Sequence, residues 1–541
     1  MQVWRILLRY GGWRLPVSVL TGLAAGAALA ALMRLVHRAL TLPPAEPGRT
    51  ALEFAGLLLA FFAGTVIAEH ALNDTAERFQ WELRQNLLRQ VLARPLRQLE
   101  RAGAPRLIDL LSNHVKIAAD YLCWLPSAVV NFAIVLCCFG YMAWLSPAVF
   151  VFNLGFAALA AVCYIVPQRA ARRVGRAAQA VWDRHLRQLH FSVVAARLLL
   201  LNRAKRIDFL SRHFRPGGAE VRVLNARHRF IDVITERFAE TMVLANIACL
   251  LFVLPRFMTL PAATVTGLIL AAVFGLSPLK SLFDIFPRTQ RIRLSLERMR
   301  EVGLDAFAPP PADEPAPAAP IGFRELVFRD VTFRYENDHD QTGFVGGPFS
   351  LRVHAGEIVF IVGGNGAGKT TLAKLLCGLY PPSGGTITVD GGPIASDTDR
   401  AALREHFAAV FTDDPLFSHL LGTDPATTGT RGPALLAELR LAHKVTLRGA
   451  EFSTTDLSQG QRRRLSLLGA VLEDRPVLLL DEWAADQDPP FRAFFYEHLL
   501  PELRAQGRTV ILITHDDRYF DRADRVIKLD AGRLIEPAPR A

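Results

Sequence analysis

Cysteine is scarce in this chain, and its placement excludes two kinds of cross-link. There are 6 cysteines in 541 residues, and none has the Cys-x-x-Cys or Cys/His spacing of a metal site. Five of them lie in or next to apolar stretches, where cysteine usually serves as a small buried hydrophobe: Cys123, Cys137, Cys138, Cys163 and Cys249. The sequence therefore predicts neither a disulfide nor a zinc site.

Charged residues are nearly absent from six apolar stretches within the first 300 residues. Most of these stretches approach the ~20 residues that a helix needs to cross a bilayer. The fifth is the weakest, because Glu240 and Arg256 bound it. The six predicted spans are 15–33, 51–68, 122–145, 148–166, 242–254 and 262–279. We therefore expect a membrane α-helical domain with six transmembrane helices.

Arginine is concentrated on one side of these spans. It is frequent in the N-terminal segment (Arg5, Arg9 and Arg14), between the second and third spans, and from 169 to 227, whereas the turns after the third and fifth spans are short and carry little charge. By the positive-inside rule, the arginine-rich segments and everything after the sixth span face the cytoplasm. The net charge of +11 thus lies beside membrane spans. This argues against the alternative of a nucleic-acid-binding surface, and we expect no nucleic-acid partner.

A cleaved secretory signal is the alternative for the N-terminus, because arginines precede an apolar run that ends in Ala28-Leu29-Ala30. That run is longer than the usual apolar core of a signal peptide. We therefore favour an interfacial helix followed by a retained first span.

The connections between spans two and three and between spans four and five are long and rich in helix formers. A helix of ~25 residues rises about 37 Å, so each connection can leave the bilayer, turn and return. We expect one turn near 93–105, where proline and glycine interrupt the helical pattern, and the other around 197–206.

A proline-rich stretch separates this region from the rest of the chain. Its composition is typical of an extended, semi-rigid spacer. We predict a transmembrane domain over 1–308, a linker over 309–320 and a second domain over 321–541. The chain shows no internal repeat.

The second domain contains one glycine-rich loop at 363–371. It follows the apolar run 358–362, a predicted buried strand, and precedes a predicted helix at 372–376. In this context backbone N–H groups turn toward phosphates, Lys369 reaches the β- and γ-phosphates, and the Thr370 hydroxyl ligates Mg²⁺. The predicted nucleotide-binding residues are Gly363, Gly364, Asn365, Gly366, Ala367, Gly368, Lys369, Thr370 and Thr371. The motif by itself indicates only that a nucleotide binds.

A second motif, Leu457-Ser458-Gln459-Gly460-Gln461, narrows the class of nucleotide-binding protein. With both motifs, the chain resembles an ABC-type ATPase. The resemblance implies that the domain binds ATP and Mg²⁺. It also implies that further residues have the functions that the corresponding residues have in the family. Asp481, which ends the apolar run 477–480, would hold Mg²⁺, and Glu482 would polarise the attacking water. His515 would face the γ-phosphate. Tyr335 would stack on adenine. Taken singly, such residues are more often structural, but together they occur in the family's order.

The resemblance also implies a composite site between two copies of the chain. Ser458, Gly460 and Gln461 of one copy would contact the nucleotide held by the other. Two positions depart from the family pattern. The usual glutamine of the Q-loop is Thr412, so contact with Mg²⁺ would pass to Thr412 or Asp413. The third signature residue is Gln459 rather than glycine.

The stretch from Asp481 to Pro489, Asp-Glu-Trp-Ala-Ala-Asp-Gln-Asp-Pro, carries a finer resemblance. It is similar to bacterial half-transporters that export cyclic peptides, lipopeptides and peptide siderophore precursors. This implies an ABC exporter fold and an ATP-driven homodimer in the bacterial cytoplasmic membrane, in contact with its lipids, with the ATPase in the cytoplasm and a peptide-like cargo.

Two alternatives remain open. One is a lipid or glycolipid flippase on the same scaffold, in which Lys280 and Asp284 contact a headgroup, although an i,i+4 ion pair or a snorkelling lysine explains them better. The other is an ABC ATPase without transport, against which the six spans argue. The polar residues predicted within the spans do not distinguish between cargoes: Asn131, Tyr141, Asn153, Tyr164 and Asn246.

Overall fold

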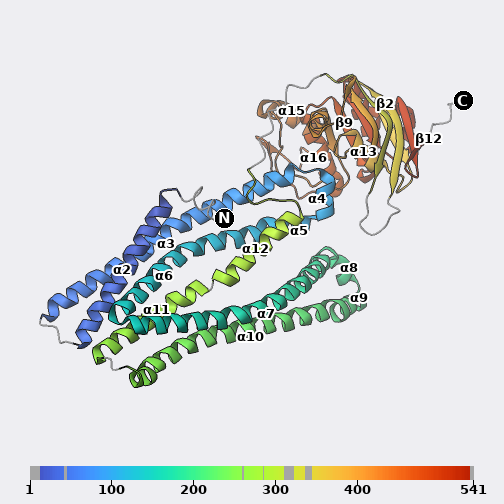
Figure 1. Cartoon of the computed structure of the whole chain (residues 1–541). Coiled ribbons are helices and arrows are strands. Elements are labelled where there is room, and N and C mark those ends of the chain that lie inside the picture. Colours follow the sequence, from blue (N-terminus) through green and yellow to red (C-terminus); the bar gives the residue numbers. More distant parts are fainter. Residues whose placement is uncertain are drawn as a thin grey trace. The chain divides into compact units, whose positions relative to one another are not determined.

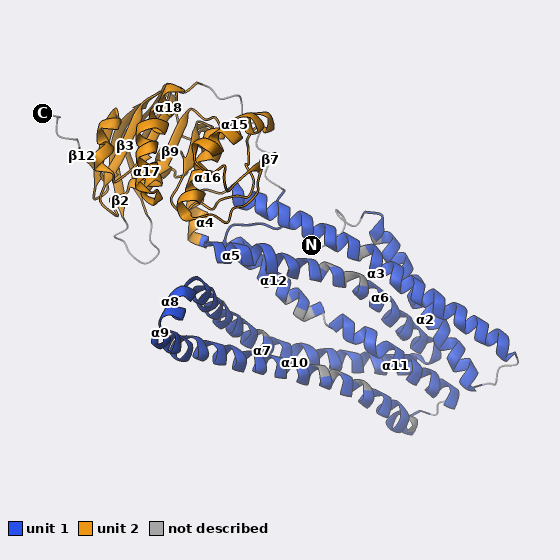
Figure 2. Cartoon of the chain, turned by 180° about the vertical axis from the view of Figure 1, so that it is seen from behind, with its two compact units in different colours: residues 1–93, 102–311 blue, residues 94–101, 312–541 orange. Residues whose placement is uncertain are grey.

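The computed structural model describes residues 12–41, 46–258, 261–283, 285–309, 322–335 and 344–535. Arg5 and Arg9, Asp284 and almost all of the predicted linker lie outside these residues. The chain divides into two compact units, Met1–Ala93 with Ala102–Pro311, and Arg94–Arg101 with Ala312–Ala541 (Figure 2).

Seven long helices make up most of the first unit. They are α2 (Arg14–Thr41), α3 (Pro47–Leu92), α6 (Val115–Leu145), α7 (Pro147–Val194), α10 (Arg215–Ala248), α11 (Ala262–Phe283) and α12 (Ile285–Glu301). At 1.5 Å per residue, the 46 residues of α3 extend for about 69 Å, more than twice the ~30 Å hydrocarbon core of a bilayer. Such helices therefore continue beyond the membrane.

Five helices of the described chain are long and apolar enough to cross a membrane. They are Pro16–Thr41, Pro47–Leu92, Ser127–Leu145, Pro147–Val194 and Ala262–Phe283. The predicted span 242–254 falls on the end of α10 and on a π-helical turn, η3 (Cys249–Val253). Arg237 and Glu240 shorten the uncharged part of α10, so hydropathy alone does not identify this helix as a span.

Helices α2, α3, α6 and α11 pack together, and α10 runs beside α7 (Figure 1). Small residues allow the first group to approach closely, as is common between membrane helices. A Cβ atom on Gly64 of α3 would lie 3.0 Å from the Thr21 carbonyl oxygen of α2, and one on Gly26 would lie 3.2 Å from the Ala133 backbone of α6. By contrast, Leu59 and Phe62 on α3 are exposed, as expected for side chains that face lipid.

Short helices lie at both predicted turns of the long connections. The first turn contains α4 (Leu96–Ala102) and α5 (Ala104–Asp109), separated by Gly103 with φ 76°. The second contains α8 (Ala196–Leu201) and α9 (Arg203–Asp208), and the Asn202 side chain caps α9 by accepting a bond from the Lys205 N–H. Proline and glycine interrupt the helical pattern at the first turn, and at the second turn the asparagine cap starts the short helix α9.

The second unit contains two main sheets. A six-stranded, mostly parallel sheet has the order β12-β11-β3-β10-β9-β6, and a four-stranded antiparallel sheet has the order β2-β1-β4-β5. The strands are β1 (Glu325–Arg334), β2 (Val345–His354), β3 (Ile358–Gly363), β4 (Gly384–Val389), β5 (Gly392–Pro393), β6 (Phe407–Val410), β9 (Val477–Asp481), β10 (Thr509–Ile513), β11 (Arg525–Asp530) and β12 (Arg533–Ile535).

The parallel sheet is buried on both faces, which explains its continuous apolar runs. Successive side chains of β3 enter different cores: Phe360 packs with the helices α15 (Pro425–Glu438) and α16 (Gln459–Leu472), whereas Val359 and Ile361 pack with α13 (Lys369–Leu376) and the antiparallel sheet. Helix α13 begins earlier than predicted, at Lys369, because Gly368 already forms its cap.

Residues 94–101 belong to this second unit through specific contacts. The Glu100 carboxylate lies 2.7 Å from Lys374 Nζ and accepts a hydrogen bond from the Tyr380 hydroxyl. Arg97 lies over the Phe333 ring at 5.3 Å. A short segment from the first long connection thus packs on the side of α13 next to β1.

Candidate nucleotide site

The glycine-rich loop lies between β3 and α13 and exposes the N-terminus of that helix. Gly368 caps α13 with φ 95°, a left-handed conformation that favours glycine. A Cβ atom on Gly363 would lie 2.3 Å from the Leu529 carbonyl oxygen, so a side chain cannot fit there. The first N–H groups of a helix have no intrahelical partner, so this loop can bind an anion such as phosphate.

Lys369 is held inside this loop. Its side chain is only 6% exposed, and Nζ donates to the carbonyl oxygens of Gly363 at 3.1 Å and Gly364 at 3.2 Å. The Glu482 carboxylate lies 3.6 Å from the same Nζ. The ammonium group is therefore already directed toward the space that the loop encloses.

Asp481 and Thr370 form a pair that fits a divalent cation. Asp481 is the buried last residue of β9, and its Oδ2 accepts a hydrogen bond from Thr370 Oγ1 at 3.1 Å. Its other oxygen, Oδ1, is buried, and no described residue donates to it. Burial raises the pKa of Asp481 above its usual range, and a cation would offset the cost of the buried charge. Hard oxygen ligands of this kind suit Mg²⁺.

Thr412 and Asp413 differ in their relation to this pair. Thr412 Oγ1 donates to the Asp481 carbonyl oxygen at 3.1 Å, whereas the Asp413 side chain is exposed on the loop. Of the two residues predicted to replace the Q-loop glutamine, Thr412 is the one that contacts the cation-binding residue.

Glu482 and His515 meet because their strands are parallel neighbours. Asp481 on β9 pairs in register with Ile513 on β10, so the residues that follow emerge at the same edge of the sheet. His515 Nε2 lies 3.2 Å from Glu482 Oε1. Glu482 itself adopts φ 49°, an uncommon conformation for a non-glycine residue. A carboxylate held here can orient a water molecule for phosphoryl transfer.

Tyr335 lies near the loop at the end of β1. Its hydroxyl is 3.2 Å from Thr371 Oγ1, and its half-buried ring packs edge-on against Phe333 at 5.0 Å. The position is compatible with stacking on a base. Asn365, Gly366 and Ala367 complete the loop between β3 and α13.

The signature residues start helix α16. Ser458 is the N-cap: its Oγ accepts a bond from the Gln461 N–H at 3.4 Å, while Gln461 Oε1 accepts one from the Ser458 N–H at 3.2 Å. A Cβ atom on Gly460 would lie 2.7 Å from the Asp486 carbonyl oxygen, so glycine is required there. Among the described residues, no hydrogen bond or ion pair joins residues 458–461 to the glycine-rich loop.

Arg463, which was not predicted as a site residue, links several parts of the site. Its buried guanidinium lies 2.7 Å from Asp486 Oδ2, donates to the Glu482 carbonyl oxygen at 2.7 Å, and approaches the Thr412 carbonyl oxygen at 3.4 Å. Gln459 Nε2 donates to the same Asp486 carboxylate at 3.0 Å. The sequence contained a signal that could have identified this cluster of contacts, because Gln459 and the stretch around Asp486 both depart from the common ABC pattern.

The glycine-rich loop, the strand-end carboxylates and the signature helix define an ABC-type ATPase. The family model described as "ABC transporter" matches residues 347–485. The chain is 33% identical, over 99% of its length and 96% of the relative, to the "ATP-binding protein SyrD" of Pseudomonas syringae pv. syringae. It is 26% identical, over 89% of its length and 82% of the relative, to the "ATP-dependent lipid A-core flippase" of Alkalilimnicola ehrlichii.

A solved structure supports the same fold. A bacterial Atm1-family ABC exporter with ATP bound superposes with a TM-score of 0.73 at 21% identity, covering 98% of this chain and 96% of that one. The chain therefore belongs to the ABC transporter family. It is a multi-pass ABC exporter in which ATP hydrolysis is coupled to transport.

Proposed function

We propose that the chain is a half-transporter that, as a homodimer, uses ATP to export a medium-sized cyclic or modified peptide or a peptide siderophore. The observation that carries this is the stretch from Trp483 to Pro489, whose sequence resembles exporters of such cargo. Trp483 is fully buried and its Nε1 donates to the Arg463 carbonyl oxygen at 2.8 Å. Ala484 and Gln487 of the same stretch are also buried, so these three residues are part of the packed ATPase domain.

The membrane orientation follows from the arginine distribution. The protein lies in the bacterial cytoplasmic membrane, with the transmembrane domain over 1–308 and the ATPase domain over 321–541 facing the cytoplasm. Cargo therefore enters from the cytoplasm, and ATP must favour the closed dimer over the open one in order to switch the cavity outward.

The residues of the nucleotide site divide the work of hydrolysis. Lys369 holds the β- and γ-phosphates. Thr370 and Asp481 would hold Mg²⁺, which would supply positive charge to neutralise the phosphates. Glu482 orients the attacking water, and His515, at 3.2 Å from Glu482, fixes the carboxylate and faces the γ-phosphate.

The signature residues Ser458, Gly460 and Gln461 act on the nucleotide of the partner copy, and the exposed Ser458 caps its γ-phosphate. A protein with Ser458→Cys and Gly364→Cys tests this dimer. ATP should promote a crosslink between two chains, and a crosslink that forms only within one chain and without ATP would contradict the arrangement.

Transport itself is tested in inside-out vesicles. ATP should drive accumulation of a fluorescent cyclic peptide, and Glu482→Gln should abolish it. Uptake of the same peptide by intact cells would contradict the direction.

A lipid flippase is the second candidate, because similarity to a lipid A-core flippase spans 89% of the chain. ATP-dependent movement of a fluorescent lipid in proteoliposomes, with no response to any peptide, would favour it over peptide export.

A further inference from the structure

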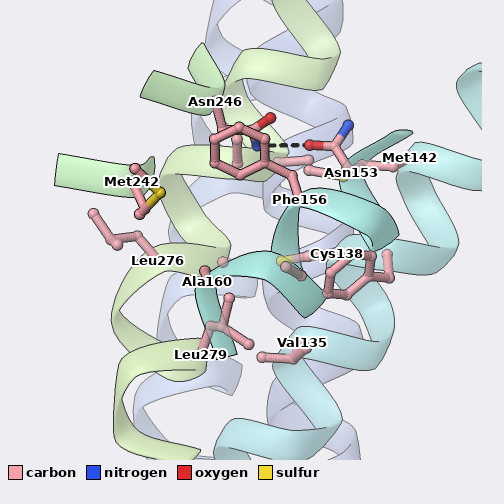
Figure 3. Close-up of a pocket in the computed structure, with 15 residues that line it drawn as sticks. Val135, Cys138, Met142, Asn153, Phe156, Ala160, Met242, Asn246, Leu276 and Leu279 are labelled. Carbon is pink, nitrogen blue, oxygen red and sulfur yellow. Dashed lines mark hydrogen bonds between the residues drawn. The ribbon is translucent and has the colours of Figure 1, made fainter. Parts of the chain in front are cut away.

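A pocket of about 60 Å³ lies among α6, α7, α10 and α11 of the first unit (Figure 3). Its walls are almost entirely apolar and include Cys138, Met142, Phe156 and Leu276. The wall residues come from two pairs of neighbouring helices, α6 with α7 and α10 with α11, and each helix contributes at least one of them. Since α6, α7 and α11 all qualify as membrane-spanning by length and composition, the pocket lies at the depth of the bilayer.

Two asparagines supply the polar side chains of this pocket. Asn246 Nδ2 donates to Asn153 Oδ1 at 2.6 Å (Figure 3). Asn153 Nδ2 in turn donates to the Val149 carbonyl oxygen, one turn earlier on α7, at 2.9 Å. Asn246 Oδ1 is also buried, and no described residue donates to it. A buried acceptor in an apolar environment is costly unless a donor reaches it.

A charged pair lies beside one end of the pocket. Lys280, which follows the wall residue Leu279, donates to Glu240 Oε1 at 3.0 Å, and Glu240 lies two residues before the wall residue Met242. Lys280 is thus bound to a neighbouring helix. The pocket itself therefore combines one neutral acceptor with apolar walls.

We propose that this pocket is a recognition subsite for the cargo, in which Asn246 Oδ1 accepts a hydrogen bond from an amide N–H of a peptide and the walls bind the adjacent apolar side chain. The proposal rests on the export of peptides proposed above. By this measure a cavity needs roughly 10–15 Å³ to hold one water molecule, so about 60 Å³ suits one side-chain-sized group, and the rest of the cargo lies outside the pocket.

The arrangement favours a peptide over a glycan headgroup. Hydroxyl groups of a sugar are closely spaced, and each would need a partner among these apolar walls. A peptide amide has one N–H donor, and its nitrogen is two bonds away from the Cβ atom of the residue's side chain. One N–H next to one apolar side chain matches a pocket with the single acceptor Asn246 Oδ1 and apolar walls.

The test uses the full-length protein in nanodiscs and a cyclic decapeptide of leucine and valine, together with derivatives N-methylated at one amide each. The measured quantity is the peptide concentration that gives half-maximal stimulation of ATP hydrolysis. In the parent protein, methylation of the recognised amide should raise this concentration about 3- to 10-fold, the effect of one neutral hydrogen bond. In Asn246→Leu, the unmethylated peptide should show the same loss, and methylation should have no further effect.

Two variants separate recognition from a purely structural role of the asparagine pair. Gly275→Ala keeps the pair but narrows the pocket, since its Cβ would make an ordinary contact at 3.6 Å with Cys138; it should weaken the response to peptides whose side chain next to the recognised amide is large. Thr241→Val is the matched control on α10, because the exposed Thr241 hydroxyl only bonds the Arg237 carbonyl oxygen of its own helix. It should respond like the parent protein.

The outcomes distinguish this subsite from the proposed function. In one outcome, the parent protein responds to the peptide, the effect of methylation is the same in Asn246→Leu as in the parent protein, and Gly275→Ala does not change the dependence on side-chain size. Peptide export then stands and the subsite is wrong. If the parent protein responds to lipid A and to none of the peptides, the cargo class is wrong, and the subsite with it.

Discussion

At the nucleotide site Glu482 lies 3.6 Å from Lys369 and 3.2 Å from His515, whereas the membrane pocket contains one pair of neutral amides. The nucleotide site thus concentrates charged groups where phosphates bind. The membrane pocket places few polar groups in an apolar surrounding. ABC exporters share the reaction but differ in cargo, so we expect the charged site to control turnover with any cargo and the neutral pocket to control only the response to cargo. The following substitutions test that division.

Lys369→Ala should have the largest effect. It removes the cation that the loop holds for the phosphates, and loss of such a group typically costs about 100-fold or more in turnover. Nucleotide binding, measured with a fluorescent ATP analogue, should fall together with ATP hydrolysis. Hydrolysis at the parental rate would contradict the assignment of the site.

Glu482→Gln should separate binding from hydrolysis. The amide keeps the shape of the side chain but cannot accept a proton, so turnover should fall about 100-fold while ATP binding persists. The trapped closed dimer should be visible as increased crosslinking between Ser458→Cys and Gly364→Cys in this background. Unchanged hydrolysis would remove Glu482 from its proposed role.

Arg463→Gln should have an intermediate effect of about 10-fold on kcat with little change in KM for ATP. The guanidinium positions Glu482 through its backbone and Asp486 through its carboxylate, and misplacement of a catalytic group slows the chemical step. Arg504→Gln is the control, because it removes another arginine–aspartate pair, at 2.9 Å from Asp524, that includes none of the residues that Arg463 contacts. A similar loss in both variants would indicate a general effect on stability.

Tyr335→Ala should have the smallest effect, a rise of about 5-fold in KM for ATP, because it removes stacking on the base. Tyr335→Phe keeps the ring and should stay within 2-fold, roughly the effect of one exposed hydroxyl contact. If Tyr335→Phe is as impaired as Tyr335→Ala, the hydroxyl contact with Thr371 matters more than stacking.

The ATPase unit was the more predictable of the two from sequence. Its loop, strand and helix are contiguous, so residues 358–376 predict their own geometry, and the structure has β3 and α13 there. The apolar runs 477–480 and 511–513 likewise predict buried strands that end in polar residues. The membrane unit was less predictable, because hydropathy identifies spans but not their neighbours, and the predicted fifth span falls on the charged α10, which does not qualify as a span by length and composition.

The sequence by itself determined the class of the protein, since phosphate binding needs glycines and a lysine at fixed short spacing, and membrane crossing needs uncharged stretches of sufficient length. Only the tertiary structure decided which distant side chains meet. Gln459 and Asp486 are 27 residues apart, and Asn153 and Asn246 are 93 apart. No local pattern around any of these residues indicates which distant side chain it contacts. Their contacts depend on how helices and strands pack, and packing is set by the sum of many apolar contacts rather than by any local pattern.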